Sequence, residues 1–255
     1  MDFRFNRDLA ANYRSKSQII RVLTESWVSD NIYCPRCGNP KILHLPNNSA
    51  AADFYCPECK NEYELKSKNG PIGRKIADGA YNTFIQRITS NNNPDFFILS
   101  CNADELCVDN LWIVPKHFFV PDIVEKRKPL SSAARRAGWV GCSILFDEIP
   151  AQGQISIVHD RIATDKNCVI AQVERSTVLS TASIDARGWL LDILRCVNRI
   201  PKQIITLEDL YVFERWLSIR HPQNHNVRPK IRQQLQILRD DGFIEFLGRG
   251  TYRKK

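Results

Sequence analysis

The stretch CPRCGNPKILHLPNNSAAADFYCPECKNEYELK, Cys34–Lys66, contains two interleaved patterns of functional side chains. The first is a pair of Cys-x-x-Cys motifs, formed by Cys34, Cys37, Cys56 and Cys59. The second is a carboxylate, Asp53, followed by Glu64 and Lys66 in a Glu-x-Lys motif. Because the second cysteine pair lies between Asp53 and Glu64, the sequence predicts that a metal-binding element is built into the hairpin that carries the acidic residues.

The cysteine pairs have the spacing of a structural zinc site. There are 18 residues between Cys37 and Cys56, within the range typical of such sites. Four thiolates complete the tetrahedral coordination of Zn²⁺ and leave no open position for water, so His44 between the pairs is not expected to be a ligand. Disulfides or a redox pair are the alternative, which a reducing compartment disfavours. The sequence therefore predicts structural Zn²⁺ bound by all four cysteines.

The acidic residues fit a β-hairpin from Ala51 to Lys68. In the second strand a period of two places Glu64 and Lys66 on one face, where Asp53 of the partner strand can join them. Two carboxylates can bind Mg²⁺, which polarises a phosphoryl oxygen and lowers the pKa of bound water. A neighbouring lysine can orient that water and stabilise developing negative charge. Asp53, Glu64 and Lys66 are thus candidate catalytic residues, although such a string also arises by chance on solvated strands.

Composition favours a polyanionic partner. The chain of 255 residues has a formal net charge of +8 and a pI of about 9.1, so nucleic acid is the first candidate partner and a membrane surface the second. No apolar run approaches the roughly 20 residues that span a bilayer, and the charged N-terminus lacks the apolar core of a signal peptide. We therefore expect a cytoplasmic protein. The remaining cysteines are expected to be small buried hydrophobic residues: Cys101, Cys107, Cys142, Cys168 and Cys196.

Alternating helix and strand patterns predict an α/β core around a mixed sheet. Residues 7–29 are expected to form one helix and Arg74–Ser90 a second. Glu25 on the first helix could reach a metal site, but an exposed helix glutamate is the expected interpretation. Strands are expected at Asp95–Ser100 and Val108–Val114, and further strands between residues 144 and 179.

A basic segment, KRKPLSSAARRAGWVGC at Lys126–Cys142, follows the predicted core strands. Its arginines, Arg135 and Arg136, suit contacts with phosphates, and Trp139 suits contact with a base or a methyl group. The alternative is a solvated loop that ends in a core tryptophan.

The small polar segment Ser180–Gly188 is the predicted domain boundary, which divides the chain into residues 1–183 and 184–255. Helices at Gly188–Val197, Thr206–Ile219 and Arg228–Arg239, with two short strands about Gly248–Gly250, predict a winged helix. From Arg228 onward eight positive and three negative residues give a net charge of +5. The expected DNA-contacting residues are Arg232, Gln233, Gln236 and Arg249, because glutamine can pair with adenine and arginine with guanine. A protein-docking role is the alternative.

The pattern Asp53…Glu64-Leu65-Lys66 resembles the PD-(D/E)XK nuclease core, with Ala52 in place of the usual proline. Over nearly its whole length the chain also resembles the methyl-directed type II restriction endonucleases of the DpnI family. The segments that carry this resemblance are YCPRCGN, ADFYCPECKNEYELKSK, DGAY, NNNPDFFIL, RKPLSSAARRAGWVGC and KIRQQLQILRDDGFIEFLGRGTYRKK.

The resemblance implies an α/β (α+β) nuclease core with an inserted four-cysteine zinc knuckle at residues 34–59, followed by a winged-helix DNA-binding domain. It also implies Mg²⁺-dependent cleavage of double-stranded DNA at adenine-methylated GATC, with the Leu65 backbone carbonyl as a further Mg²⁺ ligand and Trp139 near the methylated adenine. Two alternatives stay open: a non-catalytic zinc and winged-helix DNA-binding regulator, and a methylation-independent nuclease of the same core fold.

Overall fold

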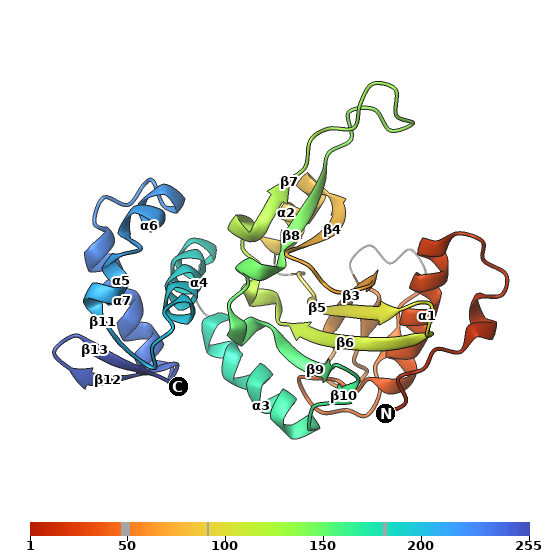
Figure 1. Cartoon of the computed structure of the whole chain (residues 1–255), viewed down its shortest axis with the longest axis horizontal. Coiled ribbons are helices and arrows are strands. Elements are labelled where there is room, and N and C mark those ends of the chain that lie inside the picture. The colour runs from red at the N-terminus through yellow and green to blue at the C-terminus, as the bar shows by residue number, and fades with distance from the viewer. Residues whose placement is uncertain (47–51, 91, 181–182) are drawn as a thin grey trace.

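The computed structural model describes residues 1–46, 52–90, 92–180 and 183–255, and its centre is a mixed seven-stranded sheet (Figure 1). The strand order is β1-β2-β3-β5-β6-β9-β10, in which β3 and β5 are parallel and the other neighbours antiparallel. The strands span Leu43–His44 (β1), Phe54–Tyr55 (β2), Glu62–Asn69 (β3), Asp95–Asn102 (β5), Cys107–Val114 (β6), Ile155–His159 (β9) and Ile162–Ala163 (β10). The predicted α/β core with a mixed sheet is confirmed.

Both faces of the sheet are covered, so its central strand β5 is an almost continuous apolar run. Phe97 and Leu99 pack into one hydrophobic cluster with helices α1 (Lys16–Asn31) and α3 (Lys166–Ser176). Phe96 and Ile98 pack into a second cluster on the opposite face, with helix α2 (Tyr81–Ile88) and a small antiparallel sheet. That sheet has the order β4-β8-β7, with β4 at Lys75–Ala80, β7 at Val124–Lys126 and β8 at Gly141–Leu145.

Three predicted elements differ from the structure. The helix expected over residues 7–29 is a 3-10 turn, Arg7–Ala10, followed by α1 from Lys16. The helix expected over Arg74–Ser90 is correct only from Tyr81, because residues 75–80 form β4 and pair with β8. The region expected to hold only strands after residue 144 also contains α3. Ala51, at the start of the predicted hairpin, lies outside the described residues.

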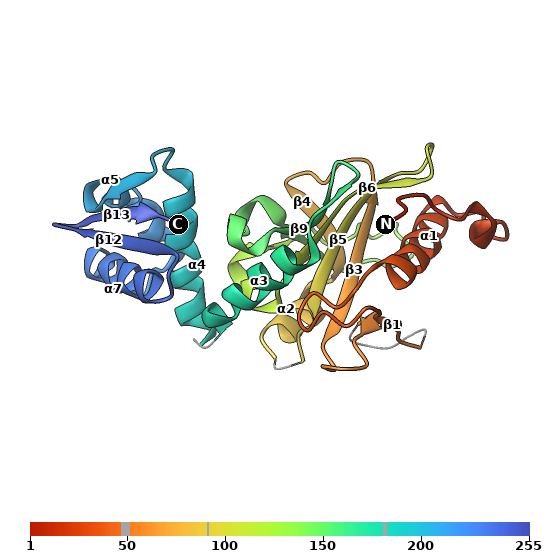
Figure 2. The same cartoon turned by 90° about the horizontal axis from the view of Figure 1, so that it is seen from below.

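The C-terminal part is helical and carries a small sheet (Figure 2). Its helices span Ile184–Arg199 (α4), Leu207–Tyr211 (α5), Glu214–Arg220 (α6) and Val227–Asp240 (α7). Its strands are Ile204–Thr206 (β11), Ile244–Gly248 (β12) and Thr251–Lys254 (β13), in the order β11-β13-β12. The predicted start at Thr206 is confirmed by a capping box with Asp209, but the expected single helix is divided into α5 and α6.

Helix α7 and the following hairpin have the arrangement of a helix with a wing. The apolar stripe of α7 is fully buried at Ile231, Leu235 and Leu238. The turn between β12 and β13 has positive φ at three successive residues, 102° at Gly248, 47° at Arg249 and 73° at Gly250. Two glycines accept this left-handed backbone readily, so the sequence GRG fixes the tip of the wing.

Polar contacts join the C-terminal helices to the rest of the chain. Arg195 of α4 contacts Glu148 at 2.8 Å, and Gln152 exchanges two hydrogen bonds with Asn198. Asp192 of α4 is buried and accepts hydrogen bonds from Arg195, Arg220 and His221. Burial opposes ionisation of Asp192, but His221 and the two arginines hold its pKa below the ordinary value. The boundary after residue 183 stays a prediction, and residues 181–182 beside it lie outside the described chain.

Two smaller expectations can be compared with the structure. Cys101, Cys107, Cys142 and Cys196 are buried as expected, but Cys168 is exposed because it lies on the outer face of α3. None of the described helices is long and apolar enough to cross a membrane.

Candidate active site and metal centre

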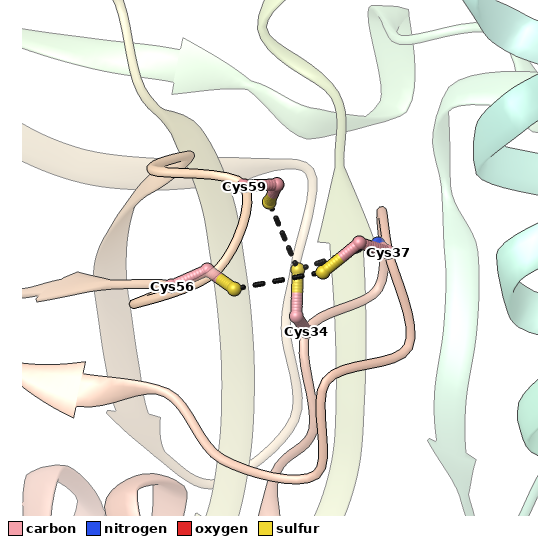
Figure 3. A group of neighbouring side chains, drawn as sticks. All are labelled: Cys34, Cys37, Cys56 and Cys59. Atoms are coloured by element: carbon pink, nitrogen blue, oxygen red, sulfur yellow. Dashed lines mark hydrogen bonds between the residues drawn. The ribbon is translucent and has the colours of Figure 1, made fainter.

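The four cysteines of the two Cys-x-x-Cys motifs come together at one point (Figure 3). All four sulfurs lie within 4.8 Å of one another, and the Cys34–Cys59 and Cys37–Cys56 sulfurs are 3.6 Å apart. Tetrahedral Zn²⁺ with Zn–S bonds of about 2.3 Å requires sulfurs about 3.8 Å apart. The donor set therefore fits a four-cysteine zinc knuckle.

The two knuckles share one backbone conformation. In each, the amide of the first cysteine donates to the carbonyl five residues later, at 2.8 Å in both Cys34 and Cys56. The residue after each second cysteine is left-handed, with φ of 76° at Gly38 and 60° at Lys60. Burial opposes ionisation of Cys56, but hydrogen bonds from the backbone amides of Cys59 and Glu58 lower its pKa to about 7. His44 lies outside this cluster, as expected.

The second knuckle sets the register of the hairpin that carries the acidic residues. The Asp53 amide donates to the Tyr63 carbonyl at 2.9 Å, and Phe54 pairs with Tyr63, so Asp53 lies at the end of β2 beside the strand that carries Glu64. An Asp53 carboxylate oxygen accepts from the Leu65 amide at 2.7 Å. The N–H and C=O groups of one strand residue point to the same side of the strand. The Leu65 carbonyl therefore points toward the side of β3 where Asp53 lies.

Lys66 lies between two carboxylates in a largely buried cluster. Its ammonium contacts Glu64 Oε1 and Asp78 Oδ1, the latter at 2.6 Å. Arg87 contacts Glu64 Oε2 at 2.5 Å from the other side. Burial raises the pKa of Glu64 despite these cations. Burial lowers the pKa of Lys66, but the charges of Glu64 and Asp78 more than offset it and leave the pKa raised.

The carboxylate cluster fits a divalent cation. Asp78 Oδ2 is buried and accepts no hydrogen bond among the described residues. Glu64 Oε2 is buried as well, and its contact with Arg87 is an ion pair without hydrogen-bond geometry. Carboxylate oxygens of this kind are the ligands that Mg²⁺ prefers. Lys66 contacts Glu64, and the Asp53 carboxylate accepts from the Leu65 amide between them, so all three predicted residues lie on or beside one strand. Their catalytic role stays a prediction.

Glu25 is a residue that sequence reasoning assigned wrongly. We expected an exposed helix glutamate, but its side chain is 17% exposed and faces the hairpin from α1. Its carboxylate lies 3.4 Å from His44 Nε2, and burial and the nearby charge of Asp53 raise its pKa. Asp78 and Arg87 were also missed. Asp78 begins the DGAY segment but was given no role there, and Glu25 and Arg87 belong to no motif; each of the three approaches the hairpin from another element.

The expected DNA-contacting residues lie in two exposed regions. The loop between β7 and β8, residues 127–140, projects from the body of the molecule (Figure 1). Arg135 is exposed on this loop, and the Arg136 guanidinium lies 4.6 Å from the centre of the Trp139 ring. Trp139 is half-buried against Gly141, the first residue of β8. The side chain is therefore held in place at the base of the loop.

The second exposed region is on the C-terminal part. Arg232, Gln233 and Gln236 are exposed on the face of α7 that is opposite its buried stripe. Gln233 accepts a hydrogen bond from Lys230 at 2.8 Å, and Arg249 is exposed at the tip of the wing. These positions suit groove contacts without requiring any change in the fold.

Family models account for nearly the whole chain. The DpnI model, described as the Dam-replacing family, matches residues 1–182. The chain belongs to the Dam-replacing family. A second model, the Dam-replacing HTH domain, matches residues 185–254. Membership of this family supports a DNA-cleaving restriction nuclease, and the HTH domain supports DNA as its partner.

Proposed function

We propose that this member of the Dam-replacing family is a Mg²⁺-dependent type II restriction endonuclease that cleaves double-stranded DNA at adenine-methylated GATC. The observation that supports the proposal is the hairpin around the four-cysteine cluster, on which Lys66 contacts Glu64 and Asp53 accepts from the Leu65 amide. In a nuclease family, this set of groups suits hydrolysis of a phosphodiester by activated water.

Each residue has a distinct role in this proposal. Asp53 and Glu64, with the Leu65 carbonyl, would hold Mg²⁺, which supplies Lewis-acid polarisation of the phosphoryl oxygen and a water of lowered pKa. Lys66 stays charged because Glu64 and Asp78 raise its pKa, so it can donate to the attacking water and stabilise charge on the phosphoryl group. Arg87 offsets the excess negative charge around Glu64.

The methyl group is read through contact with apolar surface. A methyl on adenine adds apolar area in the major groove, worth on the order of 0.8 kcal/mol when fully buried. Trp139 offers a rigid aromatic face, and Arg135 and Arg136 offer phosphate contacts beside it. In the C-terminal part, Gln233 and Gln236 can pair with adenine and Arg232 with guanine. Arg249 can contact the phosphate backbone of the DNA.

The direct test is a digest of one plasmid prepared with and without adenine methylation at GATC, in Mg²⁺ and in its absence. Cutting of only the methylated plasmid, and only with Mg²⁺, is the expected result. Cutting of both plasmids would instead favour a methylation-independent nuclease of the same fold. Binding without cutting by a zinc-loaded, folded protein would favour a DNA-binding regulator.

Trp139→Ala is expected to reduce the preference for methylated over unmethylated duplex about fourfold, because the variant loses the apolar contact with the methyl group, worth about 0.8 kcal/mol. The measurement is the ratio of cleavage rates on the two duplexes. Trp139→Phe keeps an aromatic face and serves as the matched variant, expected to retain most of the preference. An unchanged ratio in Trp139→Ala would indicate that the C-terminal part, and not Trp139, recognises the methyl group.

Asp78→Asn is expected to lower the maximal cleavage rate on the order of tenfold, because the amide no longer holds the Lys66 ammonium electrostatically. Removing this carboxylate also lowers the pKa of Lys66, so the alkaline limb of the pH–rate profile should move to lower pH. Asp147→Asn, which removes a surface partner of Arg74, is the matched control. A lower rate with an unmoved pH profile would mean that Asp78 acts only in folding.

A further inference from the structure

A cavity of about 440 Å³ lies between the last turn of α2 and the start of α4, apart from the Lys66 cluster. Its polar lining comes from both parts of the chain and includes Lys116 and His117 on one side and Ser183 and Arg187 on the other. The lining includes two cations and no carboxylate. A cavity with this composition suits an anion rather than a metal ion.

The cations of this cavity have no counter-ion within the described chain. Lys116 and Arg187 form no ion pair there, and Arg187 Nε is buried without a hydrogen-bond acceptor. Burial lowers the pKa of Arg187, and no acidic group opposes it. A buried donor without an acceptor costs about 1–3 kcal/mol, which a bound anion would recover.

His117 gives an independent indication of a missing partner. Its side chain is 1% exposed, it lines the cavity, and neither ring nitrogen has a hydrogen-bond partner among the described residues. Burial lowers its pKa to about 4; Asp95 opposes this shift, whereas Arg36, Arg187 and Lys116 add to it. Asp95, the carboxylate that opposes this shift, is already engaged by Arg36, Asn61 and the Lys116 amide.

The first turn of α4 adds backbone donors at the same place. Ser183 is the N-cap, and the amides of Ile184 and Asp185 have no partner within the 16-residue helix. The positive end of the helix dipole therefore faces the cavity, which is the usual setting for a phosphate. Asp185, the acidic residue of this turn, lines a different cavity.

The cavity also lies close to the proposed centre along the chain. It is bounded by the end of α2, and Arg87 of α2 contacts Glu64. We propose that this cavity is a phosphate-binding subsite, which holds a backbone phosphate of the bound duplex between Lys116 and His117 on one side and Arg187 with the start of α4 on the other. The statement that this phosphate belongs to DNA rests on the proposed function. The statement that the cavity binds an anion does not depend on it.

The first test measures duplex binding by the full-length protein at several salt concentrations, without added divalent metal, so that no cleavage is needed. Lys116→Gln and Arg187→Gln are each expected to weaken binding about tenfold and to reduce the slope of log K against log salt by about one. Arg187→Lys keeps the charge and should bind nearly as the unchanged protein does. Arg7→Gln, in the N-terminal 3-10 turn Arg7–Ala10, is the charge-matched control, since Figure 1 shows the N-terminal segment, in dark red, on the opposite side of the molecule from α4.

The second test follows the His117 ring by NMR, with the signal assigned through His117→Gln. Addition of inorganic phosphate, or of the duplex, is expected to raise the pKa of His117, because an anion stabilises the imidazolium. If phosphate moved the signal while both glutamine variants bound duplex normally, the site would take a free phosphate and the DNA source would be wrong. If neither probe moved the signal and binding were unchanged, the anion site itself would be refuted. Failure of the nuclease proposal would instead appear only in the plasmid digest.

Discussion

Lys66→Met is expected to abolish cleavage, with a loss of at least about 10³-fold in rate, while duplex binding persists. The ammonium is the one cation that contacts both Glu64 and Asp78 within the described site. Methionine has similar volume, so the loss reports the charge rather than the packing. The measurement is the single-turnover cleavage rate on methylated duplex in Mg²⁺, beside the binding constant of the same variant without metal.

Removal of one partner from a buried ion-pair cluster costs stability as well, on the order of 3 kcal/mol. A melting temperature must therefore accompany the rate. Lys75→Met is the matched control, because Lys75 pairs with Glu125 at the surface at 2.7 Å and such pairs contribute about 0–1 kcal/mol. Near-normal cleavage by a folded Lys66→Met protein would show that Lys66 takes no part in the chemistry. If duplex binding were lost together with cleavage, Lys66 would instead be a residue that contacts DNA.

The parts of the site that the sequence predicts are local. The cysteine spacing and the alternation around Glu64 and Lys66 both depend on neighbours within one hairpin. Such patterns translate directly into geometry, since period two fixes the face of a strand and each knuckle closes on its own backbone. The helices α4 and α7 were predictable for the same reason, because each has a local apolar stripe.

The residues that were missed depend on contacts between distant segments. Asp78 lies on β4, which the sequence presents as part of a helix because Ile76, Ala80 and Phe84 repeat every four residues. Pairing with β8, more than 60 residues later, overrides that local pattern. Glu25 reaches the site only because α1 packs beside the hairpin, and its helical surroundings give no indication of this.

Removal of zinc is expected to unfold the hairpin and to lower the melting temperature by more than about 10 °C. Binding of structural Zn²⁺ contributes about 10–16 kcal/mol in small zinc modules, which is as large as the whole stability of an ordinary domain. Cys56→Ser removes one ligand and should reproduce the effect of a chelator. Cys168→Ser, which replaces an exposed cysteine outside the cluster, is the matched control and should melt normally.

The effect should extend to the proposed catalytic residues, because the knuckle lies between them. Asp53 is three residues before Cys56, and Glu64 is five residues after Cys59, so the relative position of Asp53 and Glu64 depends on the closed knuckle. Chelation should therefore remove cleavage even when Mg²⁺ is present in excess, and added Zn²⁺ should restore both cleavage and melting temperature. Zinc release without a change in melting temperature would show that the hairpin holds its register through β3 and β5 alone, and the knuckle would then be dispensable for folding.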